Sequence, residues 1–291
     1  MRLFVVTLLI AGCAGDPAPA ELWLGGDVHV GARLEGRLAP LAEIVGGAAG
    51  VVNLEGPVGA GAEASTERRL VNAPGALAEL RAAGVRAVGI ANNHAGDLGP
   101  AGRVGTERAA RAAGLAPVGP TGAVLEVGGV RVVVTAHDLG GGVPPHLAAD
   151  LAAARARGDA LVATFHVTGP PSYLPRPELR AAVDVALAAG ARVVSAHGTH
   201  AVAAVERRGD AVIAWGLGNL IFACDCSRED EGLILRVSIP RRGRVAAEVV
   251  PVDAGLGAAP ARPSAQAPLV LELLESLGSS ALDRRGRRAA F

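Results

Sequence analysis

Short apolar runs alternate along this chain with longer segments of helical periodicity. Apolar runs of four to eight residues that stop at Gly, Asn or His are typical of buried strands. Such runs predict strands at 22–26, 50–54, 85–91, 160–166 and 191–196. Helical patterns lie between them, at 34–47, 75–83, 100–113, 147–157 and 177–189. This alternation indicates βα units with parallel strands.

The pattern changes where polar turn residues separate neighbouring strand-like runs. A hairpin is expected around Gly128-Gly129, and a Gly- and Pro-rich loop over 138–146. Further antiparallel pairs are expected at 202–207 with 211–218 and at 233–239 with 245–252, before a last helix near 268–277. Parallel units followed by antiparallel strands favour an α/β (α+β) fold of two packed sheets with helices outside.

Polar side chains gather at the ends of five predicted strands. They are Asp27 and His29, Asn53 and Glu55, Asn92 with Asn93 and His94, His166, and His197 with His200. Five of the chain's seven histidines are in this set. The loops that follow the carboxyl ends of strands form the binding crevice in open α/β sheets. The sequence therefore predicts one shared polar site.

The side chains of this set are metal ligands of mixed nitrogen and oxygen type. Seven residues are candidate ligands: Asp27, His29, Glu55, Asn93, His166, His197 and His200. Mixed ligands suit Mn, Fe or Zn better than Ca or Mg. Seven ligands exceed the three or four that one catalytic zinc uses, so they favour two divalent metal ions that share a carboxylate.

The spacing within two motifs fits this interpretation. Asp27 and His29 lie on the same side of an extended backbone, because residues i and i+2 of a strand share a face. Gly198 lets the loop between His197 and His200 turn, so that both imidazoles can point inward.

Composition excludes one class of function. All 28 basic residues are arginine, they are balanced by 28 acidic residues, and they are scattered along the sequence. Nucleic-acid binders usually carry a basic patch, so we expect no nucleic-acid partner. The one local basic cluster, Arg284, Arg285, Arg287 and Arg288, is expected to be a solvated tail.

The N-terminus has the features of an export signal. A short apolar run precedes Ile10-Ala11-Gly12-Cys13, which resembles a bacterial lipoprotein box. Residues 1–12 are then a signal peptide, Cys13 carries the lipid anchor in the membrane, and 13–20 form a tether. The protein would lie in the bacterial cell envelope, on the periplasmic face or the cell surface. A wrongly assigned start or a buried strand is the alternative.

The two remaining cysteines, Cys224 and Cys226, are not assigned to the site. An oxidising compartment would permit a bond between them, and they are interpreted as a structural or redox-incidental pair.

Five motifs together resemble the CapA family, which is linked to poly-γ-glutamate capsule synthesis. They are GDVHVG, NLE, ANNHAGDLG, the lone His166 after a strand, and GARVVSAHGTHAV followed by WGLGNLIF. That family is similar to the calcineurin-like metallophosphoesterases, so the resemblance implies a four-layer αββα sandwich of two mixed sheets. It covers 21–253 and leaves 254–291 as a C-terminal extension with a helix.

The resemblance also implies a role for each matching residue. Asp27, His29 and His200 would hold one metal, Asn93, His166 and His197 the other, and Glu55 would bridge the two. His94 matches the histidine that steadies the substrate or protonates the leaving group. Asp97 would orient His94, or would instead be a helix N-cap or a surface carboxylate. His137 and His146 match no motif and are expected at the surface or rim.

Two functions stay open. One is a dinuclear metal-dependent hydrolase of the envelope, acting on a phosphoester or an envelope polymer such as poly-γ-glutamate. The other is a non-catalytic accessory factor that works with capsule synthesis proteins in polymer assembly or export. Intact ligands favour the hydrolase, whereas the altered loop after His166 leaves the substrate open. A sugar- or peptide-binding lipoprotein has little support, because aromatic residues make up only 2% of the chain.

Overall fold

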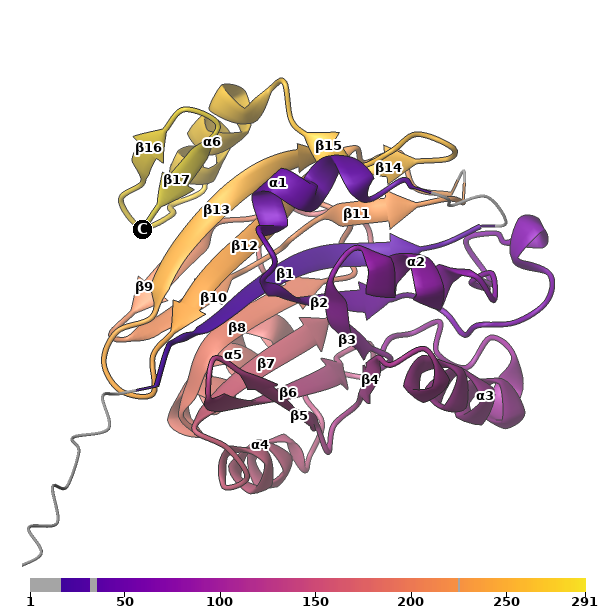
Figure 1. Cartoon of the computed structure of the whole chain (residues 1–291), viewed down its shortest axis with the longest axis horizontal. Coiled ribbons are helices and arrows are strands. Elements are labelled where there is room, and N and C mark those ends of the chain that lie inside the picture. The colour runs from indigo at the N-terminus through magenta and orange to yellow at the C-terminus, as the bar shows by residue number, and fades with distance from the viewer. Residues whose placement is uncertain (1–16, 32–35, 225) are drawn as a thin grey trace, which may run out of the picture.

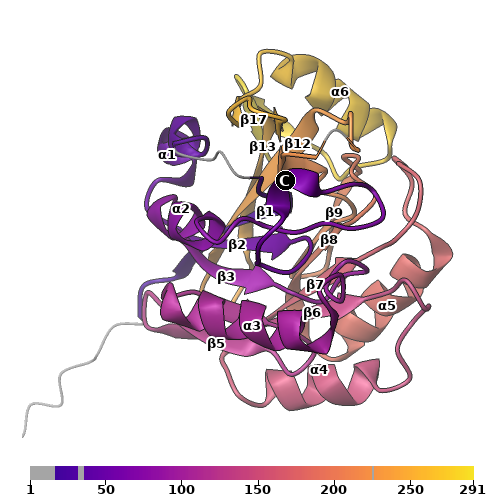
Figure 2. The same cartoon turned by 90° about the vertical axis from the view of Figure 1, so that its right-hand side faces the viewer.

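Two β-sheets are stacked face to face, with helices on both outer sides, in the computed structural model (Figures 1 and 2). The structure describes residues 17–31, 36–224 and 226–291. The expected sandwich of two mixed sheets is confirmed. None of the helices in these ranges is long and apolar enough to cross a bilayer.

The larger sheet holds the strands nearest the N-terminus and the C-terminus. Its order is β16 (Asp283–Arg285), β17 (Arg288–Ala290), β13 (Ala246–Asp253), β12 (Glu231–Ile239), β1 (Ala20–His29), β2 (Ala49–Leu54), β3 (Val85–Gly89) and β4 (Ala116–Val118). Three short strands extend it: β11 (Asn219–Phe222), β14 (Gly255–Leu256) and β15 (Arg262–Pro263).

The smaller sheet comes from the middle of the chain. Its order is β5 (Ala123–Val127), β6 (Val130–Asp138), β7 (Ala160–His166), β8 (Ala191–His197), β10 (Ala211–Ala214) and β9 (Val205–Arg208). The hairpin β5–β6 turns at Gly128-Gly129, as expected, and both glycines adopt positive φ. The antiparallel pairs β9–β10 and β12–β13 are also confirmed.

Side-chain alternation separates the layers. In β1, Leu22 and Leu24 point into the apolar layer between the sheets, while Trp23 points to the helices outside. α1 (Ala42–Val45), α2 (Ala76–Ala82) and α3 (Gly99–Ala112) cover the larger sheet, and α4 (Leu147–Arg155) and α5 (Pro177–Ala188) cover the smaller one. α6 (Ala267–Ser276) packs against the layer between the sheets. Two short 3₁₀ turns, η1 (Ala39–Leu41) and η2 (Ala62–Ala64), complete the elements.

Two expectations about local structure were wrong. The helix expected at 34–47 is reduced to η1 and α1, and it ends early because Gly46 and Gly47 both adopt positive φ. Its first two residues lie outside the described ranges. The arginine cluster near the C-terminus is exposed but is not a tail, because it forms the hairpin β16–β17, which pairs with β13.

Strand direction positions the functional residues. β1, β2 and β3 run parallel to one another, as do β6, β7, β8 and β10. The expected polar residues lie at the carboxyl ends of strands of both sheets, or in the loops that follow.

Candidate metal centre

The centre of the site is Asp27, at the end of β1, where its carboxylate is fully buried. Asn53 donates its side-chain N–H to Asp27 Oδ1 at 2.8 Å, and the backbone N–H of Gly198 donates to Oδ2 at 2.7 Å. These two bonds join Asp27 to β2 and to the loop after β8. The carboxylate is therefore fixed by both sheets.

Glycine lets the chain approach this point. A Cβ on Gly26 would lie 1.9 Å from the carbonyl oxygen of Gly218, far inside van der Waals contact. The next residue, Asp27, donates its backbone N–H to the same carbonyl at 3.0 Å. Only glycine fits at position 26.

Asp27, Glu55 and His200 bring one ligand atom each within 4.8 Å of one another, a group that could hold a metal ion. His200 Nδ1 lies 3.3 Å from Asp27 Oδ2, and His200 Nε2 lies 3.9 Å from Glu55 Oε1. Glu55 Oε2 is buried and has no hydrogen-bond partner among the described residues. A buried carboxylate oxygen without a partner is costly unless a cation or a proton satisfies it, so the donor set fits a metal ion.

The pKa values of Asp27, Glu55 and His200 also show that the two buried carboxylates favour a positive charge beside them. Burial and the nearby Asp27 raise the pKa of Glu55 well above its usual value. Burial opposes ionisation of Asp27, but the hydrogen bond from His200 and the charges of the surrounding histidines lower its pKa below normal. Burial also opposes a charge on His200, yet the two carboxylates raise the His200 pKa to about 10.

His166, at the end of β7, connects Asp27 with the loop after β3. Its Nε2 lies 2.7 Å from Asn93 Oδ1, and its Nδ1 lies 3.3 Å from Asn53 Nδ2. This pattern requires the neutral tautomer with the proton on Nε2. Burial lowers the His166 pKa to about 3, which agrees with a neutral ring.

His29 and His197 each leave a buried nitrogen free among the described residues. His29 Nε2 is 3.1 Å from the Val71 carbonyl and 3.2 Å from Ser65 Oγ, while its Nδ1 has no partner. His197 Nδ1 is likewise buried without a partner. Burial lowers the pKa of both, that of His29 to about 4, so both rings are neutral and able to ligate. The Phe222 ring contacts His29 and His200, with ring centroids 5.5 and 4.9 Å away.

His94 and Asp97 form a pair beside the site. His94 Nδ1 lies 2.7 Å from Asp97 Oδ2, and the same oxygen accepts the backbone N–H of Leu70 at 2.7 Å. His94 Nε2 lies 4.0 Å from Glu55 Oε1. Asp97 thus orients a histidine whose other nitrogen is turned toward the metal centre.

The loop after β8 has an unusual backbone. His200 is the one non-glycine residue of the described chain with positive φ, at 56°. Gly198 has φ of 93°, and a Cβ there would lie 2.7 Å from the Val167 carbonyl oxygen and 2.8 Å from the His166 ring. Strain of this kind persists where surrounding contacts enforce it, and it is common at functional sites.

Sequence reasoning misjudged or missed several neighbours. Asn53, which the sequence did not assign a role, joins Asp27 to Asn92, and Asn92 donates to Asn53 Oδ1 at 3.1 Å. Asn219 accepts from His200 Nδ1 at 2.9 Å, a role that its place in the WGLGNLIF motif could have suggested. His137 was expected at the rim and is buried, whereas His146 is exposed as expected.

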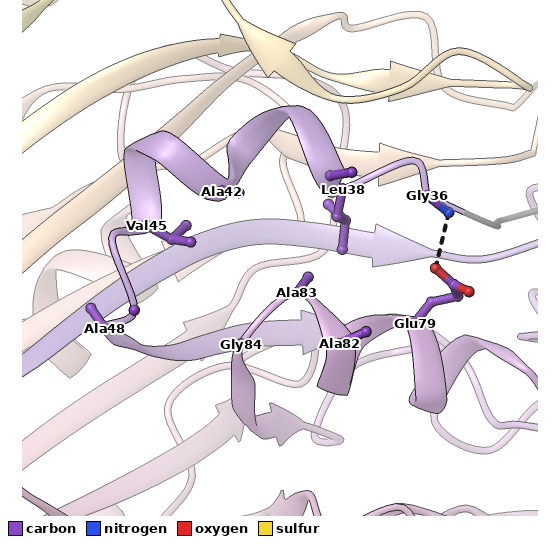
Figure 3. Close-up of a pocket in the computed structure, with 11 residues that line it drawn as sticks. Gly36, Leu38, Ala42, Val45, Ala48, Glu79, Ala82, Ala83 and Gly84 are labelled. Atoms are coloured by element: carbon purple, nitrogen blue, oxygen red, sulfur yellow. Dashed lines mark hydrogen bonds between the residues drawn. The ribbon is translucent and has the colours of Figure 1, made fainter.

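Two other features lie outside this ligand set. A groove of about 400 Å³ between α1 and α2 is lined mainly by small residues, and Glu79 accepts the backbone N–H of Gly36 across it (Figure 3). It contains none of the predicted site residues. Cys224 and Cys226 form a disulfide, and Cys224 Sγ lies 3.7 Å from the Ser65 carbonyl.

Comparison with known families settles the relationship that this geometry suggests. The profile of the family described as bacterial capsule synthesis protein PGA_cap matches residues 22–224, more than half of the chain. The chain belongs to this PGA_cap family. PGA_cap is the CapA family, part of the metallophosphoesterase-like superfamily, so the resemblance noted in the sequence is confirmed. The PGA_cap match includes every predicted ligand as well as His94 and Asp97. No curated protein matches the chain.

Proposed function

We propose that this PGA_cap protein is a dinuclear metal-dependent hydrolase of the cell envelope. Its substrate would be a phosphoester or an envelope polymer in capsule synthesis. The observation that carries the proposal is the group of Asp27, Glu55 and His200, in which one buried carboxylate oxygen has no partner in the described part of the chain. The match to a family described by its role in capsule synthesis supports a function in that process.

Seven residues would hold the two metals. Asp27, His29 and His200 would bind one, Asn93, His166 and His197 the other, and Glu55 would bridge them. Three of the seven keep a buried nitrogen or oxygen atom without a partner among the described residues, which supports their use as ligands. Two bound ions, of Mn, Fe or Zn, would activate a water molecule and offset charge on the substrate oxygens.

The chain itself would supply the proton transfer. Asp97 accepts the Nδ1 proton of His94 and keeps the ring in one orientation. His94 Nε2, turned toward Glu55, could then give a proton to a leaving group or steady the substrate. His94 would be the catalytic residue, and Asp97 its positioning residue.

Metal analysis and a hydrolysis assay test this proposal. We expect purified protein to contain close to two divalent metals and to cleave an aryl phosphoester or phosphodiester. Glu55→Ala should lose metal and activity. Glu126 is an exposed carboxylate in β5, so Glu126→Ala should lose neither. The site assignment is wrong if the protein holds no metal, or if Glu55→Ala keeps its full metal content.

An accessory role in polymer assembly or export is the second candidate. The family description, which names capsule synthesis and no reaction, favours it. Full metal content without hydrolysis of phosphoesters or glutamyl polymers would establish the accessory role. Co-purification with capsule synthesis proteins would then be expected.

Anchoring of the protein at the envelope is a separate proposal. Cys13 would be lipidated after removal of residues 1–12, all of which lie outside the described ranges. Labelling of cells with a radioactive or alkyne fatty acid should mark the wild type and leave Cys13→Ser unmarked. Equal labelling of both would contradict lipidation at Cys13.

A further inference from the structure

The end of the molecule opposite the metal centre is where the described chain begins. Ala20 pairs with Ile239, so β1 starts beside the turn between β12 and β13, at the lower left of Figure 1. A Cβ on Gly128 would lie 2.4 Å from the Pro19 carbonyl oxygen, which places the β5–β6 turn there too. The chain therefore enters the fold among the starting ends of strands from both sheets.

Arginines that are far apart in the sequence meet at this end. Arg131 and Arg241 both approach Asp159, at 3.8 and 3.6 Å. Arg192, at the start of β8, donates to the carbonyls of Pro240 and Gly243 in the β12–β13 turn. These contacts join the starts of β6, β7 and β8 to the β12–β13 turn.

We define the basic end by the arginines placed at strand starts and in the turns there. They are Arg86, Arg131, Arg192, Arg241, Arg242 and Arg244. The carboxylates in the same segments are Glu21, Glu126, Asp159 and Asp210, so arginines outnumber them. Arg242 and Arg244 are exposed and make no ion pair with any described residue.

We propose that the basic end lies against an anionic phospholipid bilayer. Anionic lipid surfaces attract clustered arginines, and this attraction acts within about one Debye length, roughly 8–10 Å. Cys13 precedes Pro17 by four residues, which span at most about 14 Å when fully extended. A chain that enters here from a lipidated cysteine would bring the basic end within reach of the headgroups.

The orientation would hold the metal centre away from the bilayer. β1 starts at the basic end and runs ten residues to His29. At about 3.3 Å per residue, this strand separates the two ends by roughly 30 Å. The metal centre would then face a polymer or ester outside the headgroup layer.

This proposal does not depend on hydrolase activity, and vesicle binding tests it separately. The full chain with Cys13→Ser would be floated with vesicles of phosphatidylglycerol and phosphatidylcholine, and with vesicles of phosphatidylcholine alone, at low and high salt. The test variant is Arg241→Gln/Arg242→Gln/Arg244→Gln. The control is Arg68→Gln/Arg69→Gln/Arg228→Gln, which removes the same charge from exposed arginines in loops at the metal-centre end.

We expect binding that requires phosphatidylglycerol and weakens with salt. The test variant should bind roughly a hundredfold less tightly, and the control like its parent. The apolar N-terminal run is common to all variants, so differences between them isolate the arginines. Equal binding by the test variant, equal loss in the control, or no preference for phosphatidylglycerol would overturn the proposal. The proposal would also be overturned if the protein did not bind vesicles but bound soluble polyglutamate through these arginines. The basic end would then be a binding surface for an anionic polymer.

Discussion

Three buried polar atoms around the candidate centre have no partner within the described chain: Glu55 Oε2, His29 Nδ1 and His197 Nδ1. Each such atom costs about 1–3 kcal/mol in a folded protein unless a ligand, a proton or a water molecule satisfies it. Glu55 belongs to the group that could hold a metal ion, so ligand binding is the simplest use for its free oxygen.

The His94–Asp97 pair gives a test of proton transfer that leaves the metals in place. If His94 supplies a proton, His94→Gln should lower kcat by roughly a hundredfold or more. Asp97→Asn should lower kcat less and change the pH profile, because the ring loses its orienting acceptor. Both variants should keep the wild-type metal content in elemental analysis. Loss of metal in His94→Gln would show that His94 is a ligand instead.

Buried His137 predicts a loss of stability in acid. Burial, opposed in part by Asp150, lowers the His137 pKa from 6.5 to about 4. Between pH 6.5 and pH 4, His137 is protonated in the unfolded chain but neutral in the folded chain. The stability from this residue is therefore complete above pH 6.5 and falls as the pH drops toward 4. The contribution of this one residue should be about 2 kcal/mol between pH 7.5 and pH 5.

Urea denaturation at these two pH values measures the difference. His137→Gln should lose about 2 kcal/mol less than the wild type on acidification. The buried histidines of the metal centre should still produce part of the acid loss in both proteins. An identical loss in wild type and variant would show that His137 does not contribute.

At the scale of elements, sequence patterns predict the features of the fold that depend on residues close together in the chain, such as individual strands. The strand that ends in His166 is fully buried, and the strand that ends in His197 is buried except at Arg192. Their ends meet because neighbouring parallel strands share an edge. β4 was missed, since three residues containing a proline give no periodic signal. The Asn53–Asn92 bond was missed because hydrogen-bond partners follow from side-chain placement, not from spacing.

The loop after β8 predicts an unusually sensitive glycine. Gly198→Ala should lower the free energy of unfolding by about 2–3 kcal/mol, because the methyl group would meet both Val167 and His166 at a positive φ. Gly243→Ala is the matched control. Its φ is 86° and its Cβ would meet nothing within 4 Å, so it should lose only about 1 kcal/mol. Chemical denaturation compares the two, and equal losses would mean that the contacts at Gly198 are unimportant.

At the scale of the whole molecule, the candidate metal centre joins the two sheets through Asp27, so a bound metal should stabilise the entire fold. A ligand present at a hundred times its Kd adds about 2.7 kcal/mol to stability. Removal of metal with EDTA should therefore lower Tm by several degrees in a thermal melt. Glu55→Ala should melt at the same temperature with and without EDTA, and a wild-type Tm that ignores EDTA would contradict a metal-bridged fold.

The charge distribution shows what a linear sequence conceals. The arginines of the basic end are spread from Arg86 to Arg244, and along the sequence they look scattered. They become neighbours because antiparallel pairing of β12 with β1 returns their turn to the starts of the parallel strands. Topology, which local patterns do not specify, creates the surface.

The hydrogen bond from Gly198 to Asp27 joins positions 171 residues apart in the chain. Contacts between such distant residues form late in folding, because a long loop must close before they can exist. During synthesis, the segment with Asp27 and Glu55 would emerge well before its histidine partners from β7 and β8. If this group binds metal, the ion could be held only after both sheets have docked, so metal loading would report the completion of folding.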